Sequence, residues 1–143
     1  MNLREDGDNI IRVGIDLDSV IMNWSNEIIN NSEEEFKILR EWAGGPDHHG
    51  RHQLICITAR SLKYLVHSVE VLTENSIIFD EYHFLGGRHK YVVNCNYLID
   101  NSLVVKENWL NHGRSLENFI QFWTKETGEG IKRLSEAIDV IEG

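Results

Sequence analysis

Residues 13–21 read Val13-Gly14-Ile15-Asp16-Leu17-Asp18-Ser19-Val20-Ile21, and this stretch decides the fold of the chain. It joins a continuous apolar run, residues 10–16, typical of a strand buried on both faces of a parallel sheet, to two carboxylates one residue apart. Ligands of open α/β sheets bind beyond the carboxyl ends of the strands. Two adjacent carboxylates there are costly to desolvate and raise each other's pKa, so a cation or a reaction is expected to offset that cost. Alone, the pair fits either a nucleophile and an acid/base with bound Mg²⁺, or a strand ending in an acidic, helix-capping turn.

Strands and helices alternate along the rest of the chain. We expect further strands at residues 53–58, 82–85 and 97–99 and a weaker one at 118–122. Helices are expected at 19–40 with a break near 30–32, at 61–72 with Ser61 as N-cap, in a short turn at 91–93, at 106–111 closing at Gly113, and at 131–141, with a loop at 44–50. This alternation predicts an α/β fold, a three-layer doubly wound parallel sheet of Rossmann-like form, in a single domain of residues 1–143.

Composition narrows the classes of partner. The formal charge is −9, from 14 basic and 23 acidic residues, which argues against a large sequence-independent grip on nucleic acid. No apolar run approaches membrane-spanning length, and the first nine residues are polar and acidic, so we expect no membrane association and no targeting segment. Cys56 and Cys95 each lie in an apolar or strand-like stretch, which predicts buried reduced thiols and a cytoplasmic setting.

Further reactive residues fall where other strands are expected to end. Thr58-Ala59-Arg60 follows the second strand, Lys90 precedes the fourth, and Asp100 follows the fourth. Because the ends of parallel strands converge, these residues bring hydroxyl and backbone N–H donors, an ammonium and a further carboxylate to Asp16 and Asp18. Positioning and neutralising phosphoryl oxygens supplies most of the catalysis in phosphoryl transfer, and paired carboxylates suit Mg²⁺.

Four ordered motifs, Asp16-Leu17-Asp18-Ser19-Val20, Ile57-Thr58-Ala59-Arg60, Lys90 and Leu98-Ile99-Asp100-Asn101, resemble those of the haloacid dehalogenase (HAD) superfamily of phosphohydrolases. The chain looks most like the branch of 5′-nucleotidases, deoxyribonucleotidases and their bacterial and phage relatives. The stretch at residues 79–86 and the ten-residue step from Lys90 to Asp100 belong to that likeness. The resemblance covers roughly residues 13–108, and four motifs in order are far more specific than any one of them.

The resemblance implies a role for each matched residue. Asp16 would attack phosphorus and form an aspartyl-phosphate, and Asp18 would protonate the leaving group and then activate water. Thr58 and the N–H of Ala59 would hold phosphoryl oxygens, and Lys90 would bridge the phosphate and Asp16. Mg²⁺ would bind Asp16, the backbone carbonyl of Asp18 and Asp100. The implied protein is a Mg²⁺-dependent phosphatase with a HAD-like core, acting on (deoxy)nucleoside monophosphates.

The chain departs from the family pattern in two places. Asn101 stands where many relatives have a second acidic residue, so altered metal affinity is expected more than lost function. The segment where relatives place a cap over the site, about residues 22–52, is short. A small cap implies an open cleft, or a cleft closed by a second copy of the chain.

Three other functions fit parts of the pattern. A catalytically weak or inactive HAD-like module would bind a phosphorylated ligand without turnover, and a nucleic-acid end phosphatase would keep the chemistry on another substrate, against which the acidic charge counts. A receiver domain of a signalling relay also combines Asp, Thr and Lys around Mg²⁺. Its Lys comes last in sequence, whereas here Asp100 follows Lys90, which argues against that assignment.

Several residues fit a structural as well as a functional role. Arg60 is equally consistent with a contact to substrate phosphate and with a capping or pairing role at a helix start. His48, His49 and His52 lie near a Gly-rich loop without metal-ligand spacing, so solvated histidines are expected. Trp24 and Trp42 could stack on a nucleobase; packing is favoured for Trp24, and both roles stay open for Trp42.

Overall fold

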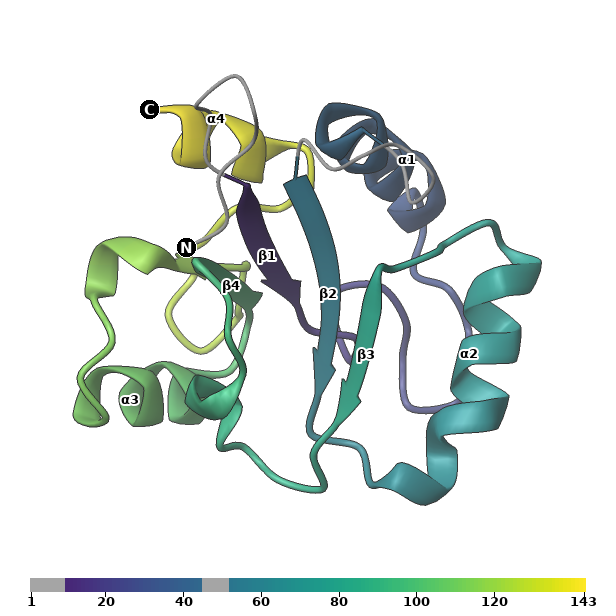
Figure 1. Cartoon of the computed structure of the whole chain (residues 1–143), viewed down its shortest axis with the longest axis horizontal. Coiled ribbons are helices and arrows are strands. Elements are labelled where there is room, and N and C mark those ends of the chain that lie inside the picture. Colours follow the sequence, from purple (N-terminus) through teal and green to yellow (C-terminus); the bar gives the residue numbers. More distant parts are fainter. Residues whose placement is uncertain (1–9, 45–51) are drawn as a thin grey trace.

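One sheet of five parallel strands organises the computed structural model, which describes residues 10–44 and 52–143 (Figure 1). Its order is β3-β2-β1-β4-β5. The strands are β1 (Ile11–Ile15), β2 (His52–Thr58), β3 (Glu81–Phe84), β4 (Tyr97–Asp100) and β5 (Phe119–Gln121). All five strands expected from the sequence are present close to their predicted bounds. The predicted doubly wound, Rossmann-like α/β fold is confirmed.

The central strand β1 is the most tightly enclosed element. Val13 lies opposite Leu54 of β2 on one side and Tyr97 of β4 on the other, and Val13 and Ile15 are fully buried. Gly14 between them is required by close approach, because a Cβ there would lie 2.5 Å from Ile57 Cδ1 and 3.2 Å from Leu98 Cδ1. The strand that leads into Asp16 is therefore fixed on both edges and on both faces.

Helices cover both faces of the sheet and make three layers. On one face α1 (Ser32–Ala43), α2 (Leu65–Glu74) and α4 (Glu136–Glu142) contribute Phe36, Leu39, Leu72 and Ala137 to a core with Val13, Leu54 and Ile99. On the other face α3 (Leu103–Asn111) packs Val105 and Trp109 against Ile55, Ile57 and Leu98. Short 3₁₀ turns η1 (Leu62–Tyr64), η2 (Lys90–Val92) and η3 (Leu116–Asn118) complete the connections.

The prediction of a helix at residues 19–40 is wrong for the first half of that range, where the chain forms no helix. The N–H groups of Val20, Ile21 and Met22 all donate to the carbonyl of Leu17, and the chain then doubles back so that Met22 bridges Ile28. Ser19, Asn26 and Asn31 adopt positive φ, which Asn tolerates better than most residues and which ends regular helix. Helix α1 begins only at Ser32, close to the predicted break.

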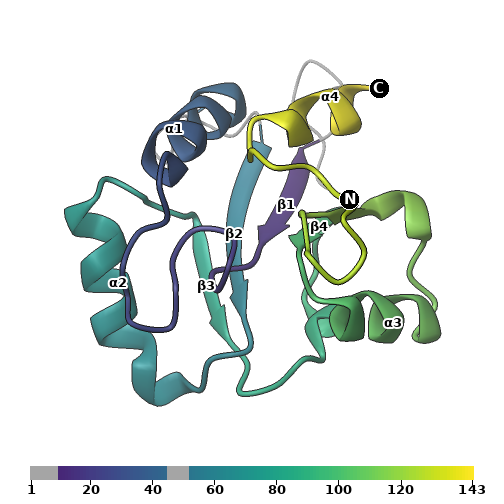
Figure 2. The same ribbon diagram turned by 180° about the vertical axis from the view of Figure 1, so that it is seen from behind.

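Within its described residues, 22–44 and 52, the predicted cap segment divides into two parts. Helix α1 buries Phe36, Leu39 and Ala43 in the sheet core and is the crossover helix between β1 and β2. The irregular stretch 19–31 runs across the same face of the sheet (Figure 2). This irregular stretch, and not α1, is the part that contacts the residues beyond the ends of β1 and β2.

Two other helix boundaries differ from the sequence pattern. Helix α4 begins at Glu136 and not at Ile131, because the N–H of Ile131 donates to Gln121 and the residue bridges Phe122. Helix α3 begins at Leu103, since the Ser102 hydroxyl caps the N–H of Val105 at 3.2 Å. Gly113 follows α3 with φ 85°, as expected of a C-terminal glycine.

Both cysteines are buried and free, as predicted. Within residues 10–44 and 52–143, no helix has both the length and the apolar character needed to cross a bilayer.

Candidate active site

Asp16, Lys90 and Asp100 meet at the carboxyl ends of β1 and β4. The Nζ of Lys90 lies 2.7 Å from Asp16 Oδ1 and 2.6 Å from Asp100 Oδ2. Asp16 directly follows β1, Lys90 begins η2 and Asp100 ends β4. All three are buried, with Lys90 only 2% exposed. The predicted convergence of these side chains is confirmed by their contacts.

Backbone hydrogen bonds hold the carboxylate of Asp100 and the main chain of Asp16 in place. Asp100 Oδ1 accepts the N–H of Ser102 at 2.9 Å, which ties it to the first turn of α3. The backbone N–H of Asp16 donates to the carbonyl of Ile99 at 3.0 Å. Both side chains are thus positioned by regular elements, which hold a site more rigidly than loops do.

The electrostatics of this cluster show an excess of negative charge. Burial and, after it, repulsion from Asp100 raise the pKa of Asp16 to about 8, although Lys90 opposes both. Burial lowers the pKa of Lys90, but the two carboxylates outweigh it and the net direction is upward. One ammonium shared by two buried carboxylates leaves one negative charge uncompensated, which either a proton on Asp16 or a bound cation would relieve.

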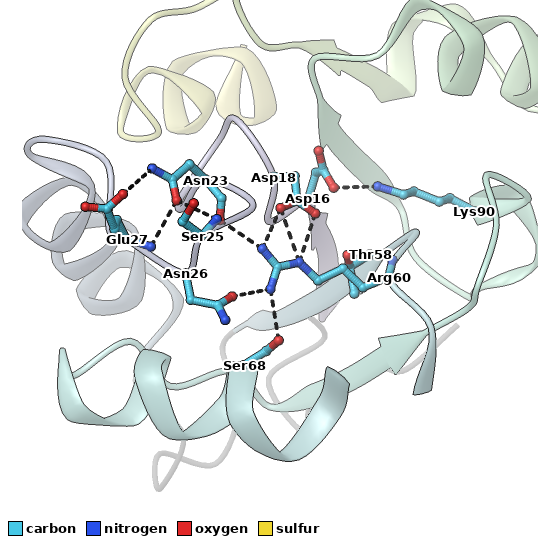
Figure 3. A network of polar contacts seen from close by, with 10 residues as sticks. All are labelled: Asp16, Asp18, Asn23, Ser25, Asn26, Glu27, Thr58, Arg60, Ser68 and Lys90. Carbon is cyan, nitrogen blue, oxygen red and sulfur yellow. Dashed lines mark hydrogen bonds and ion pairs between the residues drawn. The ribbon is translucent and has the colours of Figure 1, made fainter. Parts of the chain in front are cut away.

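Asp18 is bound by Arg60 and not by Lys90 (Figure 3). Arg60 Nε lies 3.0 Å from Asp18 Oδ2, and Arg60 Nη2 lies 2.6 Å from Asp18 Oδ1. The same guanidinium donates to Asn26 Oδ1, to Ser68 Oγ at 3.0 Å and to the carbonyl of Asn23 at 2.9 Å. These contacts correspond to the pairing role considered for Arg60, and its contact with a phosphate stays a prediction.

Thr58 is the last residue of β2 and Ala59 follows it, beside the end of β1. The side chain of Thr58 is fully buried, and its Oγ1 accepts the N–H of Arg60 at 3.1 Å. The carbonyl of Thr58 accepts the N–H of Leu85, which joins the loops after β2 and β3. The contacts of Thr58 and Ala59 with phosphoryl oxygens, expected from the sequence, stay predictions.

The donor set fits Mg²⁺ through two carboxylates. Among the described residues there is no cluster of three or more His, Cys, Asp or Glu side chains arranged around a metal, because the Asp18 carboxylate faces Arg60. Asp16 and Asp100 both face the Lys90 ammonium, and one of their two charges is left without a cationic partner. Mg²⁺ is commonly bound by one or two carboxylates together with waters and substrate phosphate, so Asp16 and Asp100 satisfy its protein share.

The surroundings of Trp24 and of His52 differ from those of core and solvated residues, respectively. Trp24 is 68% exposed and lies outside the core, and its ring centre lies 5.2 Å from the Arg60 guanidinium carbon. His52 belongs to β2, is half-buried, stacks on Trp42 and accepts the N–H of Ile11, so it is not a solvated loop residue. Trp42 also donates to Glu142, a packing role. His48 and His49 lie outside the described residues.

Sequence reasoning missed the residues around Arg60. Asn23, Asn26 and Ser68 come from an irregular turn and from the buried side of α2, and no spacing in the sequence relates them to Asp18. The one available signal was a serine on the apolar side of the helix expected after Ser61. Comparisons of the chain with protein-family models, curated proteins and solved structures find no match. The case for a function therefore rests on the site.

Proposed function

We propose that the chain is a Mg²⁺-dependent phosphomonoester hydrolase of the HAD type, acting on a small phosphate ester such as a nucleoside monophosphate. The observation that carries the proposal is the buried Asp16 at the end of the central strand, 2.7 Å from Lys90 and facing a second carboxylate. A structural ion pair would not need two carboxylates for one ammonium. A site that receives a cation and a phosphoryl group would.

Asp16 is the proposed nucleophile. Lys90 binds its Oδ1, and within the described residues no hydrogen bond ends on Oδ2, which is the oxygen left to attack phosphorus. Lys90 then lies beside the attacking carboxylate and can neutralise a phosphoryl oxygen. The Thr58 hydroxyl and the Ala59 N–H are the proposed donors to the remaining phosphoryl oxygens.

Asp16 and Asp100 would hold Mg²⁺, which when bound neutralises the charge of the phosphoryl oxygens. Asp18 is the proposed acid toward the leaving alkoxide and the base toward water. The choice of nucleotides rests on the resemblance of the motifs to the nucleotidase branch. Two buried thiols without a disulfide support a cytoplasmic setting. With its short cap, the proposed site is either an open cleft or a cleft closed by a second copy of the chain.

A second function, binding of a phosphorylated ligand with little turnover, is favoured by one observation. Both oxygens of Asp18 are held by Arg60, so the proposed acid must act from within this ion pair or leave it. A module that only bound phosphate would meet no such requirement.

The test is phosphate release from a panel of ribo- and deoxyribonucleoside monophosphates, p-nitrophenyl phosphate and a 5′-phosphorylated oligonucleotide, with Mg²⁺ or with EDTA. We expect Mg²⁺-dependent release from at least one small ester, and its loss in Asp16→Asn, which removes the nucleophile at nearly constant volume. Release that survives in Asp16→Asn would overturn the mechanism. Mg²⁺-dependent binding of nucleotide by calorimetry, with no release, would establish the binding module instead.

A further inference from the structure

Arg60 connects three parts of the molecule that meet at the candidate site. We propose that Arg60 is a positioning residue, which fixes the carboxylate of Asp18 and the turn at residues 23–27 as one unit and does not itself bind phosphate. The kinetic part of this inference rests on the proposed function, in which Asp18 is the acid toward the leaving group.

The guanidinium has no donor left for a substrate. Arginine carries five N–H donors, one on Nε and two on each terminal nitrogen. Nε and one N–H of Nη2 bind the two oxygens of Asp18, and the other N–H of Nη2 binds the Asn23 carbonyl. The two N–H groups of Nη1 bind Asn26 Oδ1 and Ser68 Oγ. A contact between Arg60 and a phosphate would require breaking one of these five hydrogen bonds.

Burial and backbone contacts fix Arg60 at both ends. The residue is 3% exposed, and Ser68 on α2 is buried beside it. The Arg60 N–H donates to Thr58 Oγ1, and its carbonyl accepts the N–H of Gly86 at 3.0 Å. The side chain therefore begins in the junction of the β2 and β3 loops and ends between Asp18 and α2 (Figure 3).

The turn that Arg60 holds is itself ordered by Asn23. Asn23 Oδ1 accepts the N–H groups of Ser25 and Glu27, and the Asn23 amide nitrogen donates to Glu27. Asn26, at φ 63°, directs its side-chain oxygen to Arg60. Trp24 projects from this turn with its ring over the guanidinium. The Arg60 side chain thus holds both the carboxylate of Asp18, the proposed acid, and the turn at residues 23–27.

This arrangement predicts a specific kinetic signature. The value of kcat/KM reports steps up to formation of the phosphoryl-enzyme. An alkoxide leaving group needs a proton from Asp18 in that step, whereas p-nitrophenolate leaves readily without one. Disturbing the position of Asp18 should therefore lower kcat/KM for adenosine 5′-monophosphate far more than kcat/KM for p-nitrophenyl phosphate. Loss of a residue that binds the phosphoryl group would lower both values alike.

The experiment compares Arg60→Lys, Ser68→Ala and the control Arg40→Lys with wild type on those two substrates. Lysine keeps the charge but cannot make the paired contact with Asp18. For Arg60→Lys we expect kcat/KM for adenosine 5′-monophosphate to fall about tenfold or more relative to that for p-nitrophenyl phosphate, up to the roughly 10²–10⁴-fold that general acid catalysis contributes. Ser68→Ala, which removes one contact of Nη1, should give a smaller change in the same direction. Arg40, paired with Asp80 at 2.9 Å, is a matched arginine outside the site, and its lysine variant should leave the ratio unchanged.

Amide hydrogen exchange gives a second readout that needs no activity. In Arg60→Lys and Ser68→Ala, exchange should speed up within residues 20–31 while the sheet stays protected, and Arg40→Lys should not change that segment. Equal losses on both substrates, or unchanged exchange at 20–31 in Arg60→Lys, would overturn the proposal. Absence of phosphate release by wild type from every ester of the panel described above would instead defeat the proposed function, and the exchange comparison alone would then support or overturn the link between Arg60 and the turn.

Discussion

Lys90 carries the charge balance of the site at the residue scale. Its ammonium contacts both Asp16 and Asp100 and compensates one of their two negative charges in a buried region. Removing one partner of a buried ion pair leaves an uncompensated buried charge, which costs more than the pair contributes.

We expect Lys90→Met to lower the free energy of unfolding by about 3 kcal/mol or more, because two buried carboxylates would then face each other without a cation. Combining it with Asp16→Asn should restore part of the loss, because one of the two charges is gone. Urea unfolding of both variants measures the difference. A double variant no more stable than Lys90→Met would show that charge is not the cause.

Asp16 should make the metal-free protein less stable as pH rises. Its folded-state pKa of about 8 lies above the ordinary 3.8, so its stabilising contribution is complete below about pH 4 and is lost as pH rises through 8. In EDTA, Asp16→Asn should therefore match wild type near pH 4 and exceed it at pH 8, because each tenfold change in proton affinity between the folded and unfolded chain corresponds to about 1.4 kcal/mol. Thermal unfolding across this range is the measurement, and a constant difference at every pH would contradict it.

Gly14 sets the packing of the central element. A methyl group there would meet Ile57 Cδ1 at 2.5 Å, inside a core without room to expand. We expect Gly14→Ala to destabilise the fold by about 1–3 kcal/mol. Ile57→Val removes the clashing atom, so the double variant should lose less stability than the two single changes summed, as measured by chemical denaturation. Strict additivity would place the strain elsewhere.

The sequence predicts well those helices and strands whose own hydrophobic pattern determines their secondary structure. Continuous apolar residues mark β1 because it is buried on both faces, and such a run has few alternatives. The stretch 19–31 carries apolar residues at helical spacing, Val20, Trp24 and Ile28, yet positive φ at Ser19 and Asn26 and the contacts of Asn23 turn it into an irregular loop. Tertiary contacts there override local propensity, and no local pattern reports them.

The residues of the candidate site likewise fall into some that the sequence could place and some that it could not. Asp16 and Asp100 could be placed together because they lie at the ends of strands, and parallel strand ends converge. Lys90 precedes β4, and the order of the motifs joined it to them. The Arg60 contacts could not be foreseen, because their geometry depends on a turn whose shape is itself set by tertiary contacts. An arginine at position 60 is thus typical of a phosphate site, but its hydrogen bonds in the structure are to Asp18, Asn23, Asn26 and Ser68.

Metal binding should be visible in the stability of the whole molecule. A ligand that binds only the folded state stabilises it by about 2.7 kcal/mol at one hundred times its Kd. We therefore expect Mg²⁺ to raise Tm of wild type by several degrees relative to EDTA, and much less in Asp100→Asn, which removes one proposed ligand. Differential scanning fluorimetry with MgCl₂ at constant ionic strength is sufficient. An equal rise in both proteins would assign the effect to general screening of the −9 charge and not to this site.

The two buried thiols give the molecule built-in reporters of its own opening. Cys56 belongs to the core beneath α1 and α2, and Cys95 to the opposite core beside α3. Burial raises the pKa of both thiols, to about 11 for Cys95, so neither presents a reactive thiolate while its layer stays closed. The rates at which an alkylating reagent reaches each cysteine would therefore time the separation of each helical layer from the sheet, one layer per thiol, without any engineered probe.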